Sequence, residues 1–291
     1  MNKIPRSELI INDDGSIFHL HLKPQHISND IILVGDPGRV EIVSSFFDKI
    51  EFKIQNREFL THTGYYRGKK ITVISSGIGT DNIDIVVNEL DALVNIDLKK
   101  RSIKKEKTSL NFIRIGTSGA LQADIPVDSY LLSKMAIGFD GMLNFYAGRN
   151  SISDLEMEKS FIKHAGWNAQ LAKPYFVRAS EEFANRIGGD IRKGITISAS
   201  GFYGPQGRVL RLNTADMNLN DKIEAFSYKN EKITNYEMES SAIYGLSKLL
   251  GHNAVTICVI IANRIRKEYS KDYKPVVKDL IKYVLDKLTD K

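Results

Sequence analysis

Short runs of apolar and β-branched residues alternate along this chain with longer stretches whose apolar residues recur at helical spacing. The apolar runs have the usual length of buried strands. They lie at residues 31–34, 71–75, 112–115, 129–133, 194–198 and 254–261. Because strand patterns alternate with helical ones, the sequence predicts an α/β fold.

Three stretches place apolar residues three and four positions apart, which is typical of a helix with one buried face. They are residues 83–94, 238–250 and 273–288, and a further helix is predicted to begin at or just after Pro37. Residues 213–232 are polar and predict a loop with a short helix. No repeat or Gly/Ser-rich linker divides the 291 residues, so we expect residues 1–291 to form a single domain.

The composition is that of a folded protein with a sizeable core. Hydrophobic residues make up 42% and charged residues 26% of the chain, which excludes intrinsic disorder. The single cysteine, Cys258, lies in an apolar run and excludes both a disulfide framework and a multi-cysteine metal site. The N-terminus lacks the pattern of a signal peptide, and no apolar stretch reaches the length of about 18 residues that a membrane span needs. We therefore expect a cytoplasmic protein.

The net charge is basic, with 41 Lys and Arg against 35 Asp and Glu, a formal charge of +6. Much of this excess lies in residues 99–109, which contain six basic residues and no aromatic one. Nucleic-acid-binding surfaces combine cations with aromatic stacking platforms, so we interpret residues 99–109 as a solvated basic surface insertion. A nucleic-acid-binding face is the alternative.

Two predicted strands run into glycine-containing turns that carry arginine. The first strand is followed by Gly35 through Arg39, where a helix N-terminus beside an arginine suits an anion. The strand at 112–115 contains Arg114 in an otherwise apolar run, and Thr117 follows at its carboxyl end. A buried arginine needs an anionic partner, which is either a bound ligand or an internal carboxylate. Ligands of α/β sheets bind at this end of the strands.

Two later segments carry groups suited to a sugar and to a base. Glu237, Met238 and Glu239 lie where an extended segment becomes a helix. A carboxylate accepts hydrogen bonds from paired hydroxyls, although acidic residues also favour helix starts for dipole reasons alone. The glycine-containing turn from residue 200 to 208 holds Gln206 and Arg208. The glutamine amide offers a donor and an acceptor together, which matches the edge of a cyclic imide.

Taken in chain order, these segments resemble the nucleoside phosphorylase superfamily of the hexameric type. The matching motifs are Gly35-Asp36-Pro37-Gly38-Arg39, Asn56-Arg57-Glu58-Phe59, Ser76-Gly77-Ile78-Gly79-Thr80, Arg114-Ile115-Gly116-Thr117, Phe202…Gln206-Gly207-Arg208 and Tyr236-Glu237-Met238-Glu239-Ser240. The resemblance implies an α/β/α fold with a central mixed sheet flanked by helices. It also implies a reversible phosphorolysis, in which a nucleoside and phosphate give the free base and ribose 1-phosphate.

The resemblance implies a role for each matching position. Phosphate would be held by Gly35, Arg39, Arg114 and Thr117, with Arg57 from the adjacent subunit. Ribose would be held by Glu237, Met238 and Glu239, with His19 from the neighbouring subunit. The base would be held by Phe202, Gln206 and Arg208. Catalysis would fall mainly to Arg114, Glu239 and Arg208, which stabilise charge as the glycosidic bond breaks.

The same resemblance bears on partners and cofactors. Sites shared between subunits imply a homo-oligomer, at least a dimer and, in this family, a hexamer. No organic cofactor or metal-ligand cluster is implied, and inorganic phosphate is a co-substrate. Family members hold a monovalent cation between subunits near positions matching Glu58 and Ile78, but the third ligand, usually serine, is Asn82 here.

The identity of the base depends on Asn263. Purine-cleaving relatives carry an aspartate near the last strand that protonates the leaving purine, and the matching position here is Asn263. Because an asparagine cannot act as a general acid, the sequence favours uridine, whose imide edge suits Gln206 and Arg208. The alternatives are a purine nucleoside phosphorylase, a nucleosidase that uses water, and a non-catalytic nucleoside-binding relative. A nucleosidase would leave the three arginines of the phosphate site without an anion.

Overall fold

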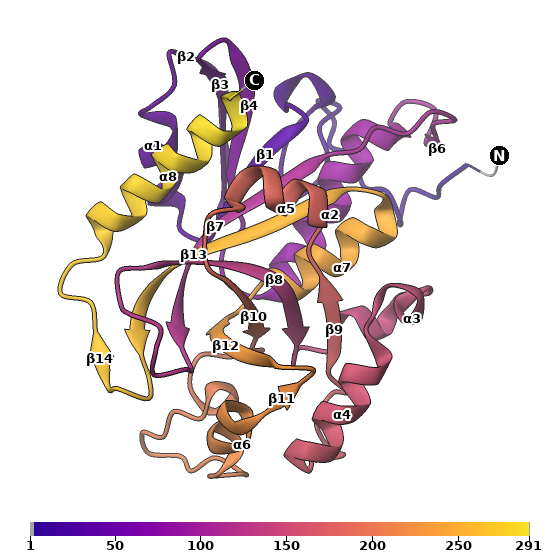
Figure 1. Ribbon diagram of the computed structural model, residues 1–291. Coiled ribbons are helices and arrows are strands. Elements are labelled where there is room, and N and C mark those ends of the chain that lie inside the picture. Colours follow the sequence, from indigo (N-terminus) through magenta and orange to yellow (C-terminus); the bar gives the residue numbers. More distant parts are fainter. Residues whose placement is uncertain (1–2, 291) are drawn as a thin grey trace.

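A computed structural model describes residues 3–290 and shows a large mixed sheet with helices on both faces (Figure 1). Its central strands β1 (Asp30–Val34), β4 (Lys69–Ser75), β7 (Asn111–Ala120) and β13 (Asn253–Asn263) run parallel in the order β13-β7-β1-β4. These strands are almost wholly buried, as expected of parallel strands that are covered on both faces.

One half of the sheet closes into a ring of five strands. Beyond β13 come β8 (Tyr130–Gly138), β10 (Lys193–Ser198) and β12 (Glu231–Glu237), and β12 pairs back onto β7. The closing contact is antiparallel and places Tyr236 opposite Gly119 and Asn235 opposite Ala120. This closure brings the end of β12 beside β7, although the two strands are more than 100 residues apart in the chain.

The other half of the sheet ends in a hairpin. Strands β2 (Lys49–Asn56) and β3 (Phe59–Tyr66) pair with each other, and β3 pairs with β4. Short strands complete the structure: β9 (Tyr175–Arg178) on β8, β11 (Ser227–Tyr228) on β12, β14 (Glu268–Tyr269) on β13, and the separate pair β5 (Ile96–Asp97) and β6 (Ser102–Ile103).

The helices form two layers, one on each face of the sheet. One layer contains α1 (Pro37–Ser44), α5 (Glu181–Gly188) and α8 (Lys274–Thr289), and the other is built on α2 (Thr80–Asn95) packed against α7 (Ser240–Leu250) (Figure 1). The remaining helices are α3 (Arg149–Ile152), α4 (Leu155–Ala165), α6 (Leu219–Ala225) and the 3₁₀ turns Pro24–His26, Met142–Phe145 and Gly204–Gln206. The predicted α/β/α arrangement is confirmed.

The basic segment differs from its sequence prediction in one respect. Helix α2 ends at Asn95, and the chain then forms the short β5–β6 hairpin in place of an irregular loop. Most lysines of residues 99–109 are exposed, as expected, but Arg101 is not simply solvated. Its Nε and Nη2 donate to the carbonyls of Ile4 and Pro5, both at 3.0 Å, and so hold the N-terminal segment.

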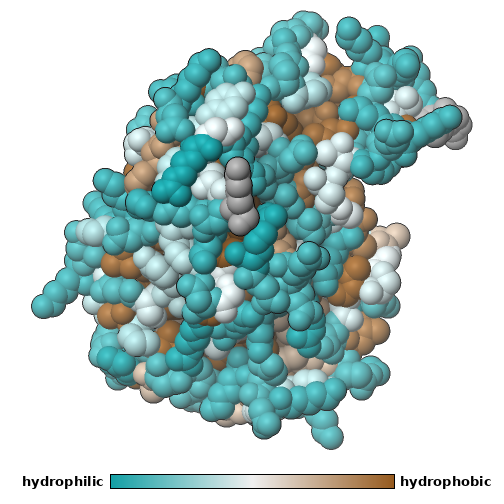
Figure 2. All heavy atoms as spheres, turned by 45° about the horizontal axis from the view of Figure 1, so that its top comes forward, coloured by the Kyte–Doolittle hydropathy of each residue, from teal (hydrophilic) through white to brown (hydrophobic). Residues whose placement is uncertain are grey.

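The surface seen from the top of Figure 1 is mostly hydrophilic, with hydrophobic side chains gathered in a hollow on its right flank (Figure 2). Among residues 3–290, no helix combines the length and the apolar character that crossing a membrane requires.

The pairing of β2 with β3 leaves no room for a side chain at Gly64. A Cβ added at Gly64 would lie 2.2 Å from the backbone oxygen of Lys49 on the paired strand, where no side-chain motion can relieve the clash. We expect Gly64→Ala to lower the free energy of unfolding by about 1–3 kcal/mol. Urea denaturation measures this, with Gly204→Ala as the control, because a Cβ there meets nothing within 4 Å. Equal stability of the two variants would contradict the packing described.

Candidate active site

The carboxyl ends of β1, β7, β12 and β13 surround a cavity of about 1030 Å³. The cavity wall contains every residue predicted for the site except His19 and Arg57, namely Gly35, Arg39, Arg114, Thr117, Phe202, Gln206, Arg208, Glu237, Met238 and Glu239. These residues come from segments spread over 200 positions, and the ring closure of the sheet brings them together.

One end of the cavity is built for an anion. Asp36 is the N-cap of α1 and accepts a hydrogen bond from the Gly38 backbone nitrogen at 2.9 Å. A Cβ at Gly35 would lie 3.3 Å from the Gly77 carbonyl, so a glycine lets the two loops approach closely. Arg39 reaches across to β7, where its Nη1 donates to the Ile115 carbonyl at 3.2 Å. Burial, and then the nearby Arg114, lower the pKa of Arg39, which indicates a desolvated region of concentrated positive charge.

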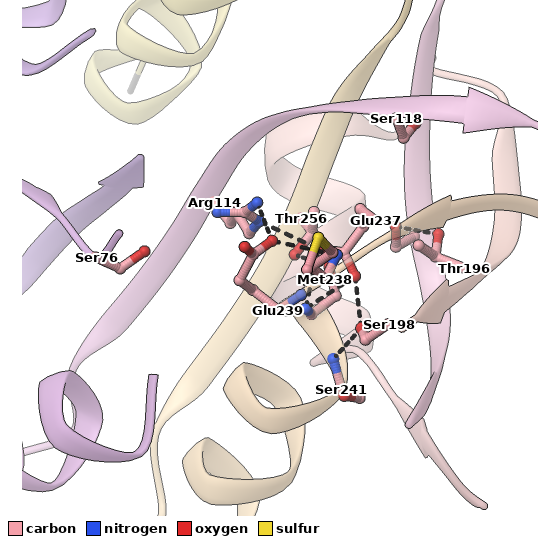
Figure 3. Close-up of polar contacts among 12 residues, drawn as sticks. Ser76, Arg114, Ser118, Thr196, Ser198, Glu237, Met238, Glu239, Ser241 and Thr256 are labelled. Atoms are coloured by element: carbon pink, nitrogen blue, oxygen red, sulfur yellow. Dashed lines mark hydrogen bonds and ion pairs between the residues drawn. The ribbon is translucent and has the colours of Figure 1, made fainter. Parts of the chain in front are cut away.

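Arg114 lies at the centre of the site and is nearly fully buried. Its Nε donates to Glu237 Oε2 at 3.2 Å, and its Nη2 pairs with Glu239 Oε2 (Figure 3). Nη1 is buried and has no hydrogen-bond partner among residues 3–290. The sequence left open whether Arg114 meets an internal carboxylate or a ligand. The structure shows internal carboxylates on two nitrogens and no partner for the third among the described residues.

Glu239 is the N-cap residue of α7, and its carboxylate has only a few partners. Its Oε1 accepts from the Gly79 backbone nitrogen at 2.9 Å, and its Oε2 accepts from Arg114 and from the Met238 nitrogen. Burial raises the pKa of Glu239 to about 7, and Arg114 opposes this shift. For Arg114 itself, burial acts to lower the pKa, but Glu239 and Glu237 raise it overall. Because Glu239 Oε1 accepts from a single backbone nitrogen, it can accept a further hydrogen bond from a hydroxyl group.

At the other end of the cavity, Arg208 organises the predicted base site. Its guanidinium carbon lies 3.8 Å from the centroid of the Phe202 ring. Its Nη1 donates to the Phe202 carbonyl at 2.7 Å and to Gln206 Oε1 at 2.5 Å. The amide oxygen of Gln206, expected to serve a ligand, is thus already occupied in this structure. The remaining ligand-binding groups are the Gln206 Nε2 donors and the other nitrogens of Arg208.

Sequence reasoning missed Arg264 as a member of the site. Arg264 follows the end of β13, donates to the Gln206 carbonyl, and lies with its guanidinium carbon 5.7 Å from the centroid of the Tyr236 ring. Burial, and then Arg264, lower the pKa of Arg208. The signal that could have identified Arg264 is its place just beyond a buried strand whose parallel neighbour, β7, also contributes to the site.

Asn263 is locked by four backbone hydrogen bonds. Its Nδ2 donates to the carbonyls of Gln122 and Ile125 at 2.9 and 2.8 Å. Its Oδ1 accepts from the backbone nitrogens of Ile265 and Arg266 at 3.0 and 2.9 Å. The buried side chain therefore shapes the loop after β13 and has no proton to give to a leaving base.

His19 and Arg57 lie together, outside the wall of this chain's own cavity. His19 Nδ1 is 2.6 Å from Glu89 Oε1, and the Asn56 amide donates to the His19 carbonyl at 2.7 Å. Arg57 has a positive φ of 53° and a guanidinium carbon 5.9 Å from the centroid of the Phe18 ring. Both side chains therefore lie apart from the cavity that holds the other predicted site residues.

Glu58, Ile78 and Asn82, the positions matching the cation ligands of the family, line one edge of the cavity. Their carboxylate, carbonyl and amide oxygens are donor types that a hard cation accepts. Within residues 3–290, no three His, Cys, Asp or Glu side chains come together as a metal site.

Comparison with known proteins agrees with this geometry. The family model of the Phosphorylase superfamily matches residues 30–286. A protein named uridine phosphorylase from Thermococcus kodakarensis is 29% identical over 279 residues, which cover 93% of this chain and 86% of the relative. A purine nucleoside phosphorylase of the DeoD type from Listeria monocytogenes is 27% identical over 83% of this chain and 85% of its own length.

Solved structures show the same relationship. A nucleoside phosphorylase from Trypanosoma brucei, described as showing uridine phosphorylase activity, superposes with a TM-score of 0.85 at 30% identity, over 96% of this chain and 99% of that one. A structure from a study of two uridine phosphorylases in Phytophthora capsici has a TM-score of 0.70 at 20% identity, over 100% of this chain and 99% of that one, and so supports the fold. The chain belongs to the phosphorylase superfamily.

Proposed function

We propose that this protein catalyses the reversible phosphorolysis of uridine to uracil and ribose 1-phosphate. The observation that carries the proposal is Arg114, a buried arginine of the cavity wall whose Nη1 has no hydrogen-bond partner among residues 3–290. Support comes from relatives named uridine phosphorylase in Thermococcus kodakarensis and Haemophilus influenzae and from the activity described for the Trypanosoma brucei structure.

The anion end of the cavity suits phosphate because several hydrogen-bond donors line it. Arg39, Arg114, Thr117 and the Gly35 backbone line it. Arg114 pairs with both Glu237 and Glu239, so these three side chains and Arg39 together carry no net charge, and a phosphate dianion requires further positive charge. We assign that charge to Arg57 of a neighbouring copy, because Arg57 lies outside its own cavity and is held in a strained backbone conformation.

Between the two ends, Glu239 is placed to bind ribose. Its Oε1 accepts one backbone nitrogen and has room for a sugar hydroxyl, while Met238 lines the same wall. Bond cleavage creates positive charge on the ribose ring, which phosphate and the Glu239 carboxylate stabilise electrostatically. Holding phosphate and nucleoside side by side also makes the attack effectively intramolecular.

The base end stabilises the negative charge that develops on the leaving uracil. Gln206 Nε2 and the guanidinium groups of Arg208 and Arg264 converge there without a carboxylate partner of their own. Electron-rich carbonyl oxygens of a pyrimidinedione suit this set of donors. The locked Asn263 disfavours a purine nucleoside, whose departure is assisted by proton transfer.

The positions of His19 and Arg57 support a homo-oligomer, which we propose is a hexamer of three dimers. His19 Nδ1 is hydrogen-bonded to the Glu89 carboxylate. The other ring nitrogen, Nε2, is therefore the one that would contact the ribose 5′-hydroxyl in the neighbouring subunit's site. A monovalent cation at Glu58, Ile78 and Asn82 and a role in cytoplasmic pyrimidine nucleoside salvage complete the proposal.

The direct test is ultraviolet-monitored cleavage of uridine and of inosine, each with and without phosphate. We expect uridine cleavage that requires phosphate. Preferred cleavage of inosine would indicate a purine enzyme, cleavage without phosphate would indicate a nucleosidase, and cleavage of neither would indicate a binding protein.

Two variants connect this test to the anion end. Arg39→Ala and Arg114→Ala should each raise the KM for phosphate, by about tenfold or more, because each removes a charge-assisted donor. Arg192→Ala serves as the control, since Arg192 pairs with Asp124 on the exposed surface. An unchanged KM for phosphate in both cavity variants would exclude the assigned role.

Base recognition can be tested separately from phosphate binding. Gln206→Ala should reduce kcat/KM for uridine by about tenfold or more, since a donor to the base and the anchor of Arg208 are lost together. The KM for phosphate should stay within about twofold. A variant that loses phosphate affinity while keeping uridine affinity would contradict the placement of the base at this end.

The raised pKa of Glu239 predicts a pH dependence of ribose binding. As the pH falls through about 7, Glu239 becomes protonated and accepts hydrogen bonds from the ribose hydroxyls less well. Calorimetry should therefore show uridine affinity falling from pH 8 to pH 6. The affinity of 2′,3′-dideoxyuridine, which lacks both hydroxyls, should change much less. Parallel losses for the two ligands would place the titrating group elsewhere.

A further inference from the structure

The two glutamates that flank Met238 differ in how many partners they have. Glu237 Oε1 accepts from Ser198 Oγ at 2.5 Å and from the Ser240 backbone nitrogen at 3.1 Å. Its Oε2 accepts from Arg114 Nε at 3.2 Å and from the Glu239 and Ser240 nitrogens at 3.0 and 3.1 Å (Figure 3). A carboxylate has about four lone-pair sites, and the partners of Glu237 fill them.

Glu237 has no lone pair left for a ligand, and in this it differs from Glu239. The resemblance to the family implied that both line the sugar, and both do border the cavity. Only Glu239 Oε1, with a single backbone donor, keeps a lone pair for a ligand hydroxyl. A sugar hydroxyl could bind Glu237 only by displacing a donor that is itself buried and would then be left unsatisfied, which is costly.

Ser198 holds Glu237 from the side away from the cavity. This buried serine ends β10, and its Oγ donates to Glu237 while accepting from the Ser241 nitrogen at 2.9 Å. Ser241 Oγ in turn donates to Asp140 Oδ2 at 2.9 Å, and the Tyr175 hydroxyl donates to Asp140 Oδ1 at 2.8 Å. The carboxylate is thus fixed between the end of a strand and the first turn of α7.

The fixed position of Glu237 also fixes the orientation of the Arg114 guanidinium. A guanidinium is planar, so fixing Nε on Glu237 and Nη2 on Glu239 determines where Nη1 points. Nη1 is the one nitrogen of Arg114 without a partner among the described residues, and Arg114 borders the cavity. Without Glu237, the Arg114 guanidinium would be held by Glu239 alone and could rotate about that single contact.

We propose that Glu237, braced by Ser198, is a positioning residue that aims Arg114 Nη1 at phosphate and does not itself bind ribose. The proposal rests on the function proposed above only in naming phosphate as the anion. It predicts that changes at Glu237 and Ser198 lower phosphate affinity and leave the recognition of ribose hydroxyls intact. Changes at Glu239, which also pairs with Arg114, impair the recognition of ribose hydroxyls.

The test compares Glu237→Gln with Glu239→Gln by calorimetry, using inorganic phosphate, uridine and 2′,3′-dideoxyuridine as ligands. For Glu237→Gln we expect phosphate affinity to fall about tenfold or more, because a charge-assisted partner of Arg114 is lost. The ratio of uridine to dideoxyuridine affinity should stay within about twofold of the wild-type ratio. For Glu239→Gln that ratio should collapse. A collapsed ratio in Glu237→Gln with phosphate affinity intact would overturn the proposal.

Ser198→Ala extends the test should Glu237→Gln fail to fold. Ser198 does not line the cavity, so its removal can alter phosphate affinity only through its hydrogen bonds to Glu237 and to the first turn of α7. We expect a several-fold loss of phosphate affinity, restored by Ser198→Thr, which keeps the hydroxyl. Ser247→Ala is the matched control, since Ser247 is a buried serine of α7 whose Oγ has no partner. Equal effects of Ser198→Ala and Ser247→Ala would reduce the role of Ser198 to packing and overturn the proposal.

The readouts also separate this proposal from the proposed function. A wild-type protein that binds phosphate but does not cleave uridine would contradict the function and leave the positioning role open to the same calorimetric comparison, which then decides it. A wild-type protein that binds no phosphate at all would overturn the positioning role.

Discussion

A guanidinium buried in a protein interior requires anionic partners, and the placement of Arg114 on a central strand imposes that requirement on everything around it. The partners come from β12 and the start of α7, more than 120 residues later in the chain. They arrive because β12 closes a ring onto β7 and because α7 begins at Glu239. The ion pairs satisfy two nitrogens and leave Nη1 without a partner among residues 3–290, and the proposed phosphate site is built on that nitrogen.

The sequence predicted the parts of the fold that have strong local patterns. All six predicted strands occur, because a covered parallel strand is apolar throughout. Strand β7 runs five residues beyond its predicted end, since the polar residues that follow Ile115 interrupt the apolar pattern. The β2–β3 hairpin was missed, because its outer strand alternates with lysine and glutamate and resembles a surface segment. The ring closure is a contact between distant segments, and no local pattern indicates it.

For the site, the sequence identified the residue types but not how they share their hydrogen bonds. Ten predicted residues meet in one cavity, yet Glu237 and Gln206 are partly or wholly occupied by neighbours that are visible only in three dimensions. Asn263 was predicted to lack an acidic proton, and the structure adds that its amide fixes the loop after β13. Arg264 escaped prediction because a lone arginine after a strand has no distinctive spacing. The proposed phosphate, ribose and base roles therefore rest on which polar atoms of the described residues have no partner.

The central claim is that Arg114 binds phosphate with its third nitrogen while the two glutamates keep the other two. A crystal structure of the protein grown with inorganic phosphate tests it most directly. The account predicts a phosphate oxygen within hydrogen-bond distance of Arg114 Nη1, with Nε still on Glu237 and Nη2 still on Glu239. A phosphate bound in the cavity without contact to Arg114, or an Arg114 that has left both glutamates to reach it, would contradict the account.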